Sequence, residues 1–214
     1  IAVAIGLAAA HGQRVHVAHV SRAVEMELIV AAKEAGLPVT CEVSPHHLFL
    51  TESDAAALGP YGLVRPTLAT AADRDALWRH LDAVDAVATD HAPHTRQEKE
   101  GSAPPAGMPG LETLLPLLLT AVAEDRLTLD RLVELTSSGP ARLFGIETPH
   151  DSAVEVELGP AWVLPDRGYQ TACDWSPFAG MTVRGRVLRT ALHGALVWDD
   201  GTLRSRPGMG RVLF

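Results

Sequence analysis

An aspartate and two histidines, Asp90, His91 and His94, directly follow the apolar run 84–88. A short apolar run predicts a buried strand, so the three polar side chains leave the C-terminal end of that strand together. In an α/β barrel, this end of each strand carries the chemistry. A carboxylate placed there can bind a metal ion, move a proton, or do both. Asp90 could instead cap a helix, but its histidine neighbours favour a catalytic role in metal-assisted hydrolysis.

Two more polar clusters follow predicted strands earlier in the chain. The first holds His16 and His19, and the second holds Glu42, His46 and His47. Side chains alternate along a strand, so His16 and His19 face opposite sides and cannot share one metal ion. His19 lies nearer the C-terminal end and is the better ligand candidate, whereas His16 suits the core or a place behind a ligand. For His46 and His47, a place in an ordinary polar loop and a place in the site stay equally open; Glu42 can orient a histidine or a ligand.

Two loops also bear on the site. Arg65 lies in the Gly/Pro-rich segment 59–67, between two strand–helix units, and is a candidate for binding an anionic substrate. Residues 95–109 form a long polar loop, and long loops beside strand ends are often walls of active sites. Within this loop, Lys99 and its acidic neighbours are most simply solvated charges.

The elements that position these residues alternate between strand and helix. Strands are predicted at 15–20, 39–43 and 84–88, and helices at 1–11, between Ser21 and Gly36, and at 72–81, 110–124 and 129–136. Beyond Ile146 the pattern turns to β, with strands predicted at 154–158, 161–164, 182–189 and 191–198. We therefore expect an α/β unit over residues 1–146 and a small β-rich domain over 147–214. Three parallel strands cannot close a barrel of about eight, so the sheet is either small and open or part of a larger fold.

Composition excludes several classes of function. The 214 residues carry a net charge of −8 with dispersed Lys and Arg, which argues against a nucleic-acid surface. No segment reaches the roughly 20 apolar residues that span a bilayer. The two cysteines, Cys41 and Cys173, are too few for a disulfide framework and suggest a reducing cytosol. Residues 1–7 have the pattern of a helix interior, so we expect the chain to begin inside a domain.

Five segments together resemble dihydroorotase of the amidohydrolase superfamily, in the form found in multifunctional animal proteins and their bacterial relatives. They are HVAHVS (16–21), VTCEVSPHHL (39–48), VRP (64–66), ATDHAPHT (88–95) and GMPGLET (107–113). Related hydantoinases and allantoinases usually carry Cys-Pro-His-Tyr where this chain has Ser-Pro-His-His. The resemblance implies the C-terminal part, about strands 6–8, of a (β/α)8 TIM-type metal-dependent hydrolase barrel. A small β domain, composite with an N-terminal segment absent from this chain, would follow it.

The resemblance also implies roles for eight residues. Those expected at the metal are His19 and Asp90, the second being the proton shuttle as well. Those expected to contact the substrate are Arg65, His94 and the backbone of Ala106 and Gly107, and those expected near the metal centre are Glu42 and His47. The family's two zinc ions are bridged by a residue with no counterpart in this chain. The chain alone would therefore hold about half of a zinc site, which needs at least three ligands.

The implied activity is the interconversion of dihydroorotate and N-carbamoyl-aspartate in de novo pyrimidine biosynthesis. The resemblance further implies a cytoplasmic homo-oligomer that can associate with aspartate transcarbamoylase, with no nucleic-acid or membrane partner. We expect residues 1–214 to be inactive alone. Two alternatives stay open: a non-catalytic dihydroorotase-like scaffold for aspartate transcarbamoylase, and another cyclic amidohydrolase of the hydantoinase type. Metal analysis tests the first, and preference for hydantoin over dihydroorotate tests the second.

Overall fold

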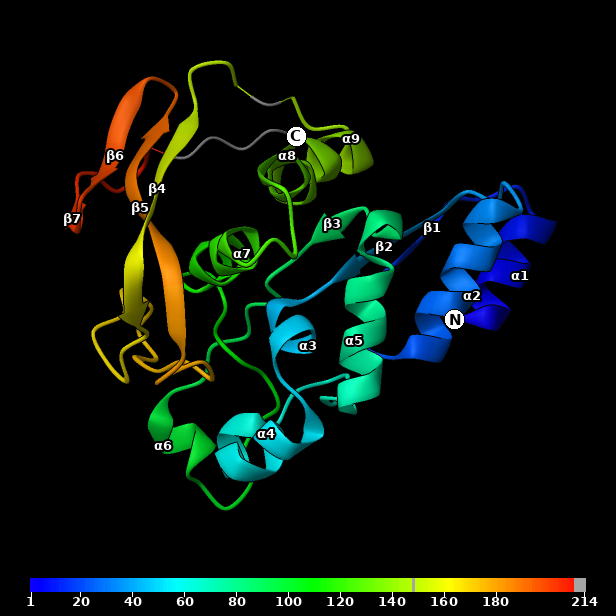
Figure 1. Ribbon diagram of the computed structural model, residues 1–214, viewed down its shortest axis with the longest axis horizontal. Coiled ribbons are helices and arrows are strands. Elements are labelled where there is room, and N and C mark those ends of the chain that lie inside the picture. The colour runs from blue at the N-terminus through cyan, green and yellow to red at the C-terminus, as the bar shows by residue number, and fades with distance from the viewer. Residues whose placement is uncertain (148, 210–214) are drawn as a thin grey trace.

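The computed structural model describes residues 1–147 and 149–209, which form two separate sheets joined by helices (Figure 1). The first sheet is parallel, with strand order β1-β2-β3. Its strands are β1 (Val15–Val17), β2 (Val39–Val43) and β3 (Ala86–Val87). The second sheet is antiparallel, with strand order β4-β5-β6-β7. Its strands are β4 (Ala153–Val163), β5 (Thr182–Leu192), β6 (Ala195–Asp199) and β7 (Thr202–Leu203).

Helices cover one face of the parallel sheet: α1 (Ala2–Ala10), α2 (Ala23–Glu34) and α5 (Ala71–Arg79) lie together beside the strands in Figure 1. The alternation of β2 explains this layer, because Val39, Cys41 and Val43 are buried while the intervening residues are partly exposed. These three side chains share one apolar core with Met26 of α2 and Leu77 of α5. The predicted βα order is therefore confirmed for this part of the chain.

Short helices fill the connections near the C-terminal ends of the strands. The segment 44–50 contains α3 (Pro45–Phe49), and the predicted long polar loop 95–109 contains α6 (Arg96–Lys99). The remaining short elements are α4 (Glu52–Leu58), η1 (Gly59–Gly62) and η2 (Leu81–Ala83). Both α3 and α6 have simple local causes, because Pro45 occupies the first helical turn of α3 and Thr95 caps α6.

Helix α7 (Leu114–Ala123) joins the two sheets and packs on β5 (Figure 1). The Thr120 hydroxyl accepts a hydrogen bond of 2.7 Å from the Arg184 backbone N–H. Gly185 has a φ of +79°, and a Cβ there would lie 2.9 Å from the Leu119 side chain, so glycine permits this close approach. After α7 come α8 (Leu129–Val133), the π-helical turn η3 (Glu134–Ser138) and α9 (Gly139–Phe144).

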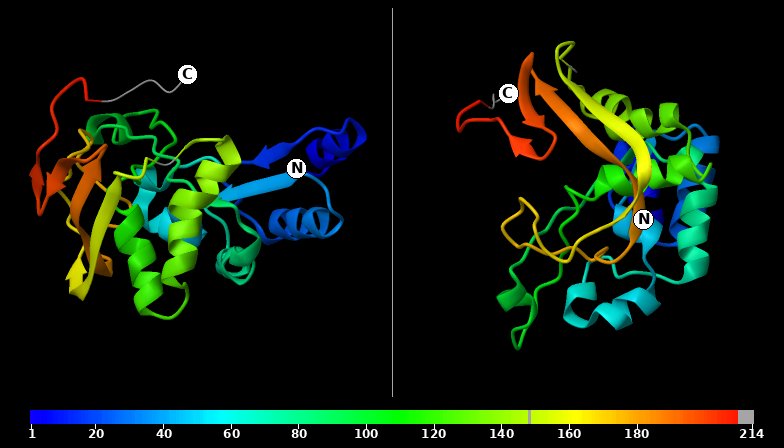
Figure 2. Two further views of the ribbon diagram at one scale, coloured as in Figure 1. Left: turned by 90° about the horizontal axis from the view of Figure 1, so that it is seen from above. Right: turned by 60° about the vertical axis from the view of Figure 1, so that its left-hand side comes forward.

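The antiparallel sheet lies at the opposite end of the molecule from α1 (Figure 2). The strands predicted at 154–158 and 161–164 are one strand, β4, because register shifts carry the pairing with β5 through Gly159 and Pro160. The strand predicted at 182–189 runs on as β5 to Leu192. Among the described residues, no helix is long and apolar enough to cross a membrane.

Candidate functional site

The three polar clusters meet because they follow three neighbouring parallel strands. His19 lies after β1, α3 begins directly after β2, and Asp90 lies after β3. The backbone beyond the short outer strands stays attached to β2, since Val20 donates to the Glu42 carbonyl at 2.9 Å and Ala88 donates to the Val43 carbonyl at 3.0 Å. Parallel strands place their carboxyl ends on one edge of the sheet, where open α/β folds bind ligands.

The backbone itself marks this edge. His19 has a φ of 39° and Asp90 a φ of 46°, so both adopt the left-handed conformation that residues with a Cβ rarely take. Such strained residues persist where the surrounding structure fixes them, and they gather at functional sites. The left-handed His19 also explains why β1 ends before the predicted limit of 20, because a left-handed residue cannot continue a strand. β3 is shorter than the predicted 84–88 at both ends, and at its start Val84 directly follows the short helix η2.

The two histidines of α3, His46 and His47, are buried close to Asp90. His46 and His47 are buried with ring centroids 4.4 Å apart, and His46 Nε2 is 3.9 Å from Asp90 Oδ2. His47 Nε2 is 3.2 Å from the Pro66 carbonyl oxygen, which fixes its ring. Burial lowers the pKa of His46 to about 3 and the pKa of His47 to about 4, so both imidazoles are neutral at pH 7. A neutral imidazole can offer a lone pair to a metal ion or accept a proton.

Three imidazole nitrogens at this edge are buried without a hydrogen-bond partner among the described residues: His19 Nδ1, His46 Nε2 and His47 Nδ1. An unpaired buried polar atom costs free energy, so a group of them indicates a position built for a ligand. Burial also raises the pKa of Asp90, with the His19 imidazole acting in the opposite direction. The edge thus combines neutral imidazoles with a carboxylate whose protonated form is favoured relative to an exposed aspartate.

Among the described residues, the strand edge offers fewer metal ligands than the expected zinc site needs. In the part of the chain that the structure describes, no three His, Cys, Asp or Glu side chains are placed to hold one metal ion. His19 and Asp90 alone are two donors, and zinc sites in proteins use at least three protein ligands. Residues 1–147 and 149–209 therefore do not make a complete metal centre by themselves.

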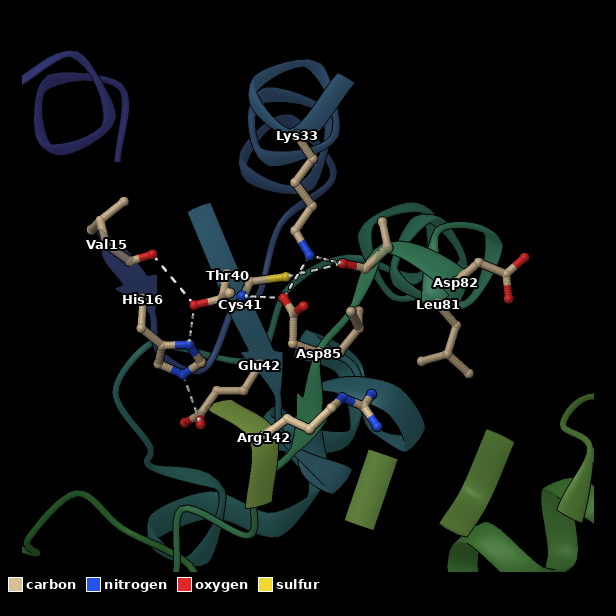
Figure 3. A network of polar contacts seen from close by, with 12 residues as sticks. Val15, His16, Lys33, Thr40, Cys41, Glu42, Leu81, Asp82, Asp85 and Arg142 are labelled. Atoms are coloured by element: carbon tan, nitrogen blue, oxygen red, sulfur yellow. Dashed lines mark hydrogen bonds and ion pairs between the residues drawn. The ribbon is translucent and has the colours of Figure 1, made fainter. Parts of the chain in front are cut away.

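Glu42 has a defined partner, His16, and the two side chains lie at the left of the polar network in Figure 3. His16 Nε2 lies 3.1 Å from Glu42 Oε2, and His16 Nδ1 lies 3.0 Å from the Thr40 hydroxyl oxygen. Thr40 and Glu42 alternate with the buried residues of β2 and so lie on the opposite face of the sheet, and His16 pairs in register with Thr40. On this face the Phe144 ring at the end of α9 lies edge-on to the His16 ring, with ring centroids 5.8 Å apart. The sequence placed His16 in the core or behind a ligand, and the structure places it where it orients Glu42. Glu42 in turn adds to the rise in the pKa of Asp90.

The residues expected at the substrate lie on loops that touch one another. Gly107 donates its N–H to the Leu63 carbonyl at 2.9 Å, two residues before Arg65, and His94 Nε2 lies 3.2 Å from the Ala106 carbonyl. Gly107 has a φ of +142°, and a Cβ there would lie 2.7 Å from the Ala92 carbonyl oxygen. Arg65 is exposed, and among the described residues its guanidinium makes no hydrogen bond or ion pair with His94, Ala106 or Gly107.

His91 and Lys99 behave differently from what the sequence suggested. His91 Nδ1 accepts the Gly110 N–H at 3.0 Å, so its ring holds the start of the following segment. Lys99 was expected to be solvated, but its side chain is fully buried beneath the substrate-side loops. The capping box formed by Thr95 and Glu98 could have revealed the short helix α6. Its burial could not be found in this way, because the covering residue Trp175 lies far along the chain.

Comparison with known proteins fixes the relationship. Over 212 residues the chain is 46% identical to multifunctional protein CAD of Squalus acanthias, covering 99% of this chain and 10% of that protein. It is 42% identical over 214 residues to the dihydroorotase of Lactiplantibacillus plantarum, covering 92% of this chain and 48% of that enzyme. The chain is homologous to the C-terminal part of dihydroorotase. It spans about half the length of the curated dihydroorotases it matches. No family model matches the chain.

Solved structures agree with this dihydroorotase homology. An L-hydantoinase from Arthrobacter aurescens superimposes with a TM-score of 0.87 at 32% identity, covering 94% of this chain and 48% of that one. An inactive dihydroorotase-like domain of a CAD-like multifunctional protein from Chaetomium thermophilum gives a TM-score of 0.80 at 32% identity, covering 96% and 57%. The expected fold class is confirmed: the chain is part of an amidohydrolase barrel followed by a small β domain.

Proposed function

We propose that this chain belongs to a zinc-dependent dihydroorotase and supplies the end of the barrel that moves the proton and binds the substrate. The reaction is the hydrolysis of the cyclic amide of dihydroorotate to N-carbamoyl-aspartate, and its reverse. The observation that carries the proposal is the meeting of His19, His46, His47 and Asp90 at one strand edge, with three imidazole nitrogens buried and unpaired. The proposal is further supported by 46% identity to a CAD protein.

The zinc expectation enters as part of this proposal. His19 and Asp90 would be two ligands of a site whose remaining ligands, including the residue that bridges two zinc ions, lie outside residues 1–214. Bound zinc supplies polarisation of a carbonyl group and a lowered pKa of water. Because the described residues do not complete a zinc site, the proposed proton transfer and substrate contacts are assigned to the protein's own side chains.

Asp90 is proposed to accept the proton of the attacking water and to pass it to the ring nitrogen that leaves. A general acid–base catalyst works best when its pKa lies near the working pH, and burial moves the pKa of Asp90 upward, in that direction. The neighbouring imidazole of His46 is neutral, so it does not compete as a cation for the carboxylate. Glu42, held by His16, and His47, held by the Pro66 carbonyl, are proposed to shape the surroundings of the centre.

The substrate carboxylate is proposed to bind Arg65 and His94, while the backbone of Ala106 and Gly107 contacts the ring. The exposed guanidinium of Arg65 suits a charge-assisted bond to a carboxylate. A Cβ at Gly107 would lie 2.7 Å from the Ala92 carbonyl oxygen, so packing alone requires glycine there, and the proposed contact of its backbone with the substrate rests on the dihydroorotase homology. We further propose that the protein acts in the cytoplasm in pyrimidine biosynthesis, as a homo-oligomer that can associate with aspartate transcarbamoylase.

Two other functions are less well supported. A hydantoinase-type activity rests on the shared fold, at 32% identity to the L-hydantoinase, whereas the dihydroorotase relatives reach 42% and the CAD protein 46%. A non-catalytic scaffold for aspartate transcarbamoylase is favoured by one observation, the likeness to the inactive domain from Chaetomium thermophilum. Zinc content and turnover of dihydroorotate against hydantoin distinguish the three functions.

The test is Asp90→Asn in the natural full-length polypeptide that contains residues 1–214. An amide cannot shuttle the proton, so we expect turnover of dihydroorotate to fall by about two orders of magnitude or more while the far-ultraviolet circular dichroism stays unchanged. The matched control is Asp82→Asn, an exposed carboxylate at the other end of β3. Turnover within about tenfold of the unmodified protein would remove Asp90 from the mechanism. An unmodified protein without zinc or turnover would favour the scaffold.

A further inference from the structure

Lys99, at the end of α6, is a charged side chain with no exposed surface. Its Nζ donates to three backbone carbonyl oxygens: Pro105 at 2.9 Å, Gly107 at 3.1 Å and Leu63 at 3.4 Å. The ring of Trp175 lies beside it, with 5.6 Å between Nζ and the ring centroid. Among the described residues, no carboxylate pairs with it.

This arrangement fits an ammonium group. An ammonium has three N–H donors and no acceptor, and here each donor has one carbonyl oxygen. Removing a charge from water is costly, and a buried lysine without a carboxylate depends on such dipoles and on the face of an aromatic ring. Burial accordingly lowers the pKa of Lys99 from its ordinary value. An apolar side chain would fill the same space at a lower cost in desolvation free energy. The ammonium is therefore expected to have a role beyond packing, through its hydrogen bonds.

The positions of the three carbonyl groups indicate the role of the Lys99 ammonium. Leu63 lies two residues before Arg65 and also accepts the Gly107 N–H. Pro105 and Gly107 flank Ala106, whose carbonyl lies 3.2 Å from His94 Nε2. Every loop that carries a proposed substrate contact is therefore bonded to Lys99 directly or through one further hydrogen bond.

Trp175 makes a second set of contacts with the same loops. Trp175, whose ring packs on Lys99, donates its Nε1–H to the His94 carbonyl at 2.6 Å. The same ring lies edge-on to Tyr61, with centroids 4.9 Å apart, and the Tyr61 hydroxyl donates to Glu100 beside Lys99. In Figure 1, α6 and α4 lie next to each other at the lower end of the molecule, where these loops gather.

We propose that Lys99 is a positioning residue for substrate binding: its ammonium bonds the loop of Arg65 to the loop of Ala106–Gly107 in the geometry that receives the anionic substrate. The inference rests on the proposed dihydroorotase function for the identity of the substrate. The bonding of the two loops rests on the structure alone.

The test compares Lys99→Met and Lys99→Arg in the natural full-length polypeptide, with zinc bound. Methionine keeps most of the volume and removes all three donors. We expect KM for dihydroorotate to rise at least tenfold in Lys99→Met, because the loops of Arg65 and Ala106–Gly107 are no longer held together. We expect kcat to stay within about threefold of the unmodified enzyme, because Asp90 is unchanged. Lys99→Arg keeps the charge, so its KM is expected to lie between the other two. Hydrogen exchange at the Gly107 amide, bonded to Leu63, is expected to be at least tenfold faster in Lys99→Met.

The matched control is Lys33→Met, which removes a partly buried lysine that donates to the Ala83 carbonyl and to Asp85 at the opposite end of the parallel sheet (Figure 3). It is expected to lower the melting temperature without changing KM or the exchange of Gly107. Equal changes of KM and Gly107 exchange in both lysine variants would overturn the proposal, as would no change in Lys99→Met.

Two further outcomes are decisive. If Lys99→Met does not fold, Lys99→Arg carries the test with both readouts, because its larger head displaces the three carbonyl groups. If the unmodified protein does not turn over dihydroorotate, the proposed function fails, and the exchange of Gly107 still decides whether Lys99 holds the two loops together.

Discussion

His94 offers a prediction at the scale of single residues, because it separates substrate binding from metal binding. His94→Ala in the full-length polypeptide is expected to raise KM for dihydroorotate by an amount worth about 1–3 kcal/mol, the contribution of a charge-assisted hydrogen bond. Zinc content is expected to stay constant. Steady-state kinetics and metal analysis on one preparation measure both, with His11→Ala, an exposed histidine at the end of α1, as the control. Loss of zinc with unchanged KM would make His94 a ligand instead.

At this scale the sequence predicted the position of the strand-end residues but not their environment. His19 and Asp90 could be found because each follows an apolar run, and the structure places both at one edge of the sheet. Their assigned roles at zinc stay predictions. His46 could not be separated from His47 by type or spacing, and only the fold brings it to 3.9 Å from Asp90. Lys99 was interpreted as solvated because burial by Trp175 is a contact between distant segments.

At the scale of elements, one carboxylate joins α5 to α2. Asp73 accepts hydrogen bonds from the Thr70 hydroxyl that caps α5 and, at 2.9 Å, from the Ala23 N–H at the start of α2. These bonds, led by that of Thr70, lower the pKa of Asp73. A carboxyl group with a lowered folded-state pKa stabilises the fold above its unfolded pKa of about 4, and this contribution is lost as the pH falls through the folded value.

We therefore expect Asp73→Ala to lower the free energy of unfolding by about 1 kcal/mol at pH 7, the usual cost of losing a capping interaction. The difference from the unmodified protein should shrink as the pH falls below about 4, where the unfolded chain begins to bind this proton, and it should be lost below the lowered folded-state pKa of Asp73. Urea unfolding followed by circular dichroism at a series of pH values measures it. Asp75→Ala, which changes an exposed carboxylate of the same helix, is the control. A difference that stays constant down to pH 2 would contradict the assignment.

The elements themselves were predictable where their period is clean. β2 has the predicted limits because apolar and polar residues alternate through it. The outer strands were predicted too long: the left-handed His19 lies inside the strand predicted at 15–20, and the short helix η2 reaches Ala83, just before the strand predicted at 84–88. The single strand β4 was divided into two predicted strands because Gly159 and Pro160 look like a turn in the sequence, whereas the structure absorbs them as an irregularity within β4.

At the scale of the whole molecule, residues 1–214 expressed alone are expected to self-associate. Large apolar side chains such as Val3, Leu111 and Leu203 are more than half exposed, and within the described residues the outer strands β1 and β3 of the parallel sheet are each paired on one side only. We also expect this polypeptide to bind little zinc and to lack dihydroorotate turnover. Size-exclusion chromatography, metal analysis and a turnover assay on one sample test this prediction. A stable monomer with two zinc ions and measurable turnover would refute it.

The contacts between the tail and the site loops have a consequence for gene fusion and recombination. Trp175 holds the His94 carbonyl, and Arg96 donates to the backbone carbonyls of Asp166 and Asp174. A crossover placed between α9 and β4, where the sequence turns from helix to strand, would take the site loops from one parent. The tail residues that hydrogen-bond to those loops would then come from the other parent. Viable chimaeras should therefore inherit the loop around residues 94–107 and the segment 164–178 from the same parent.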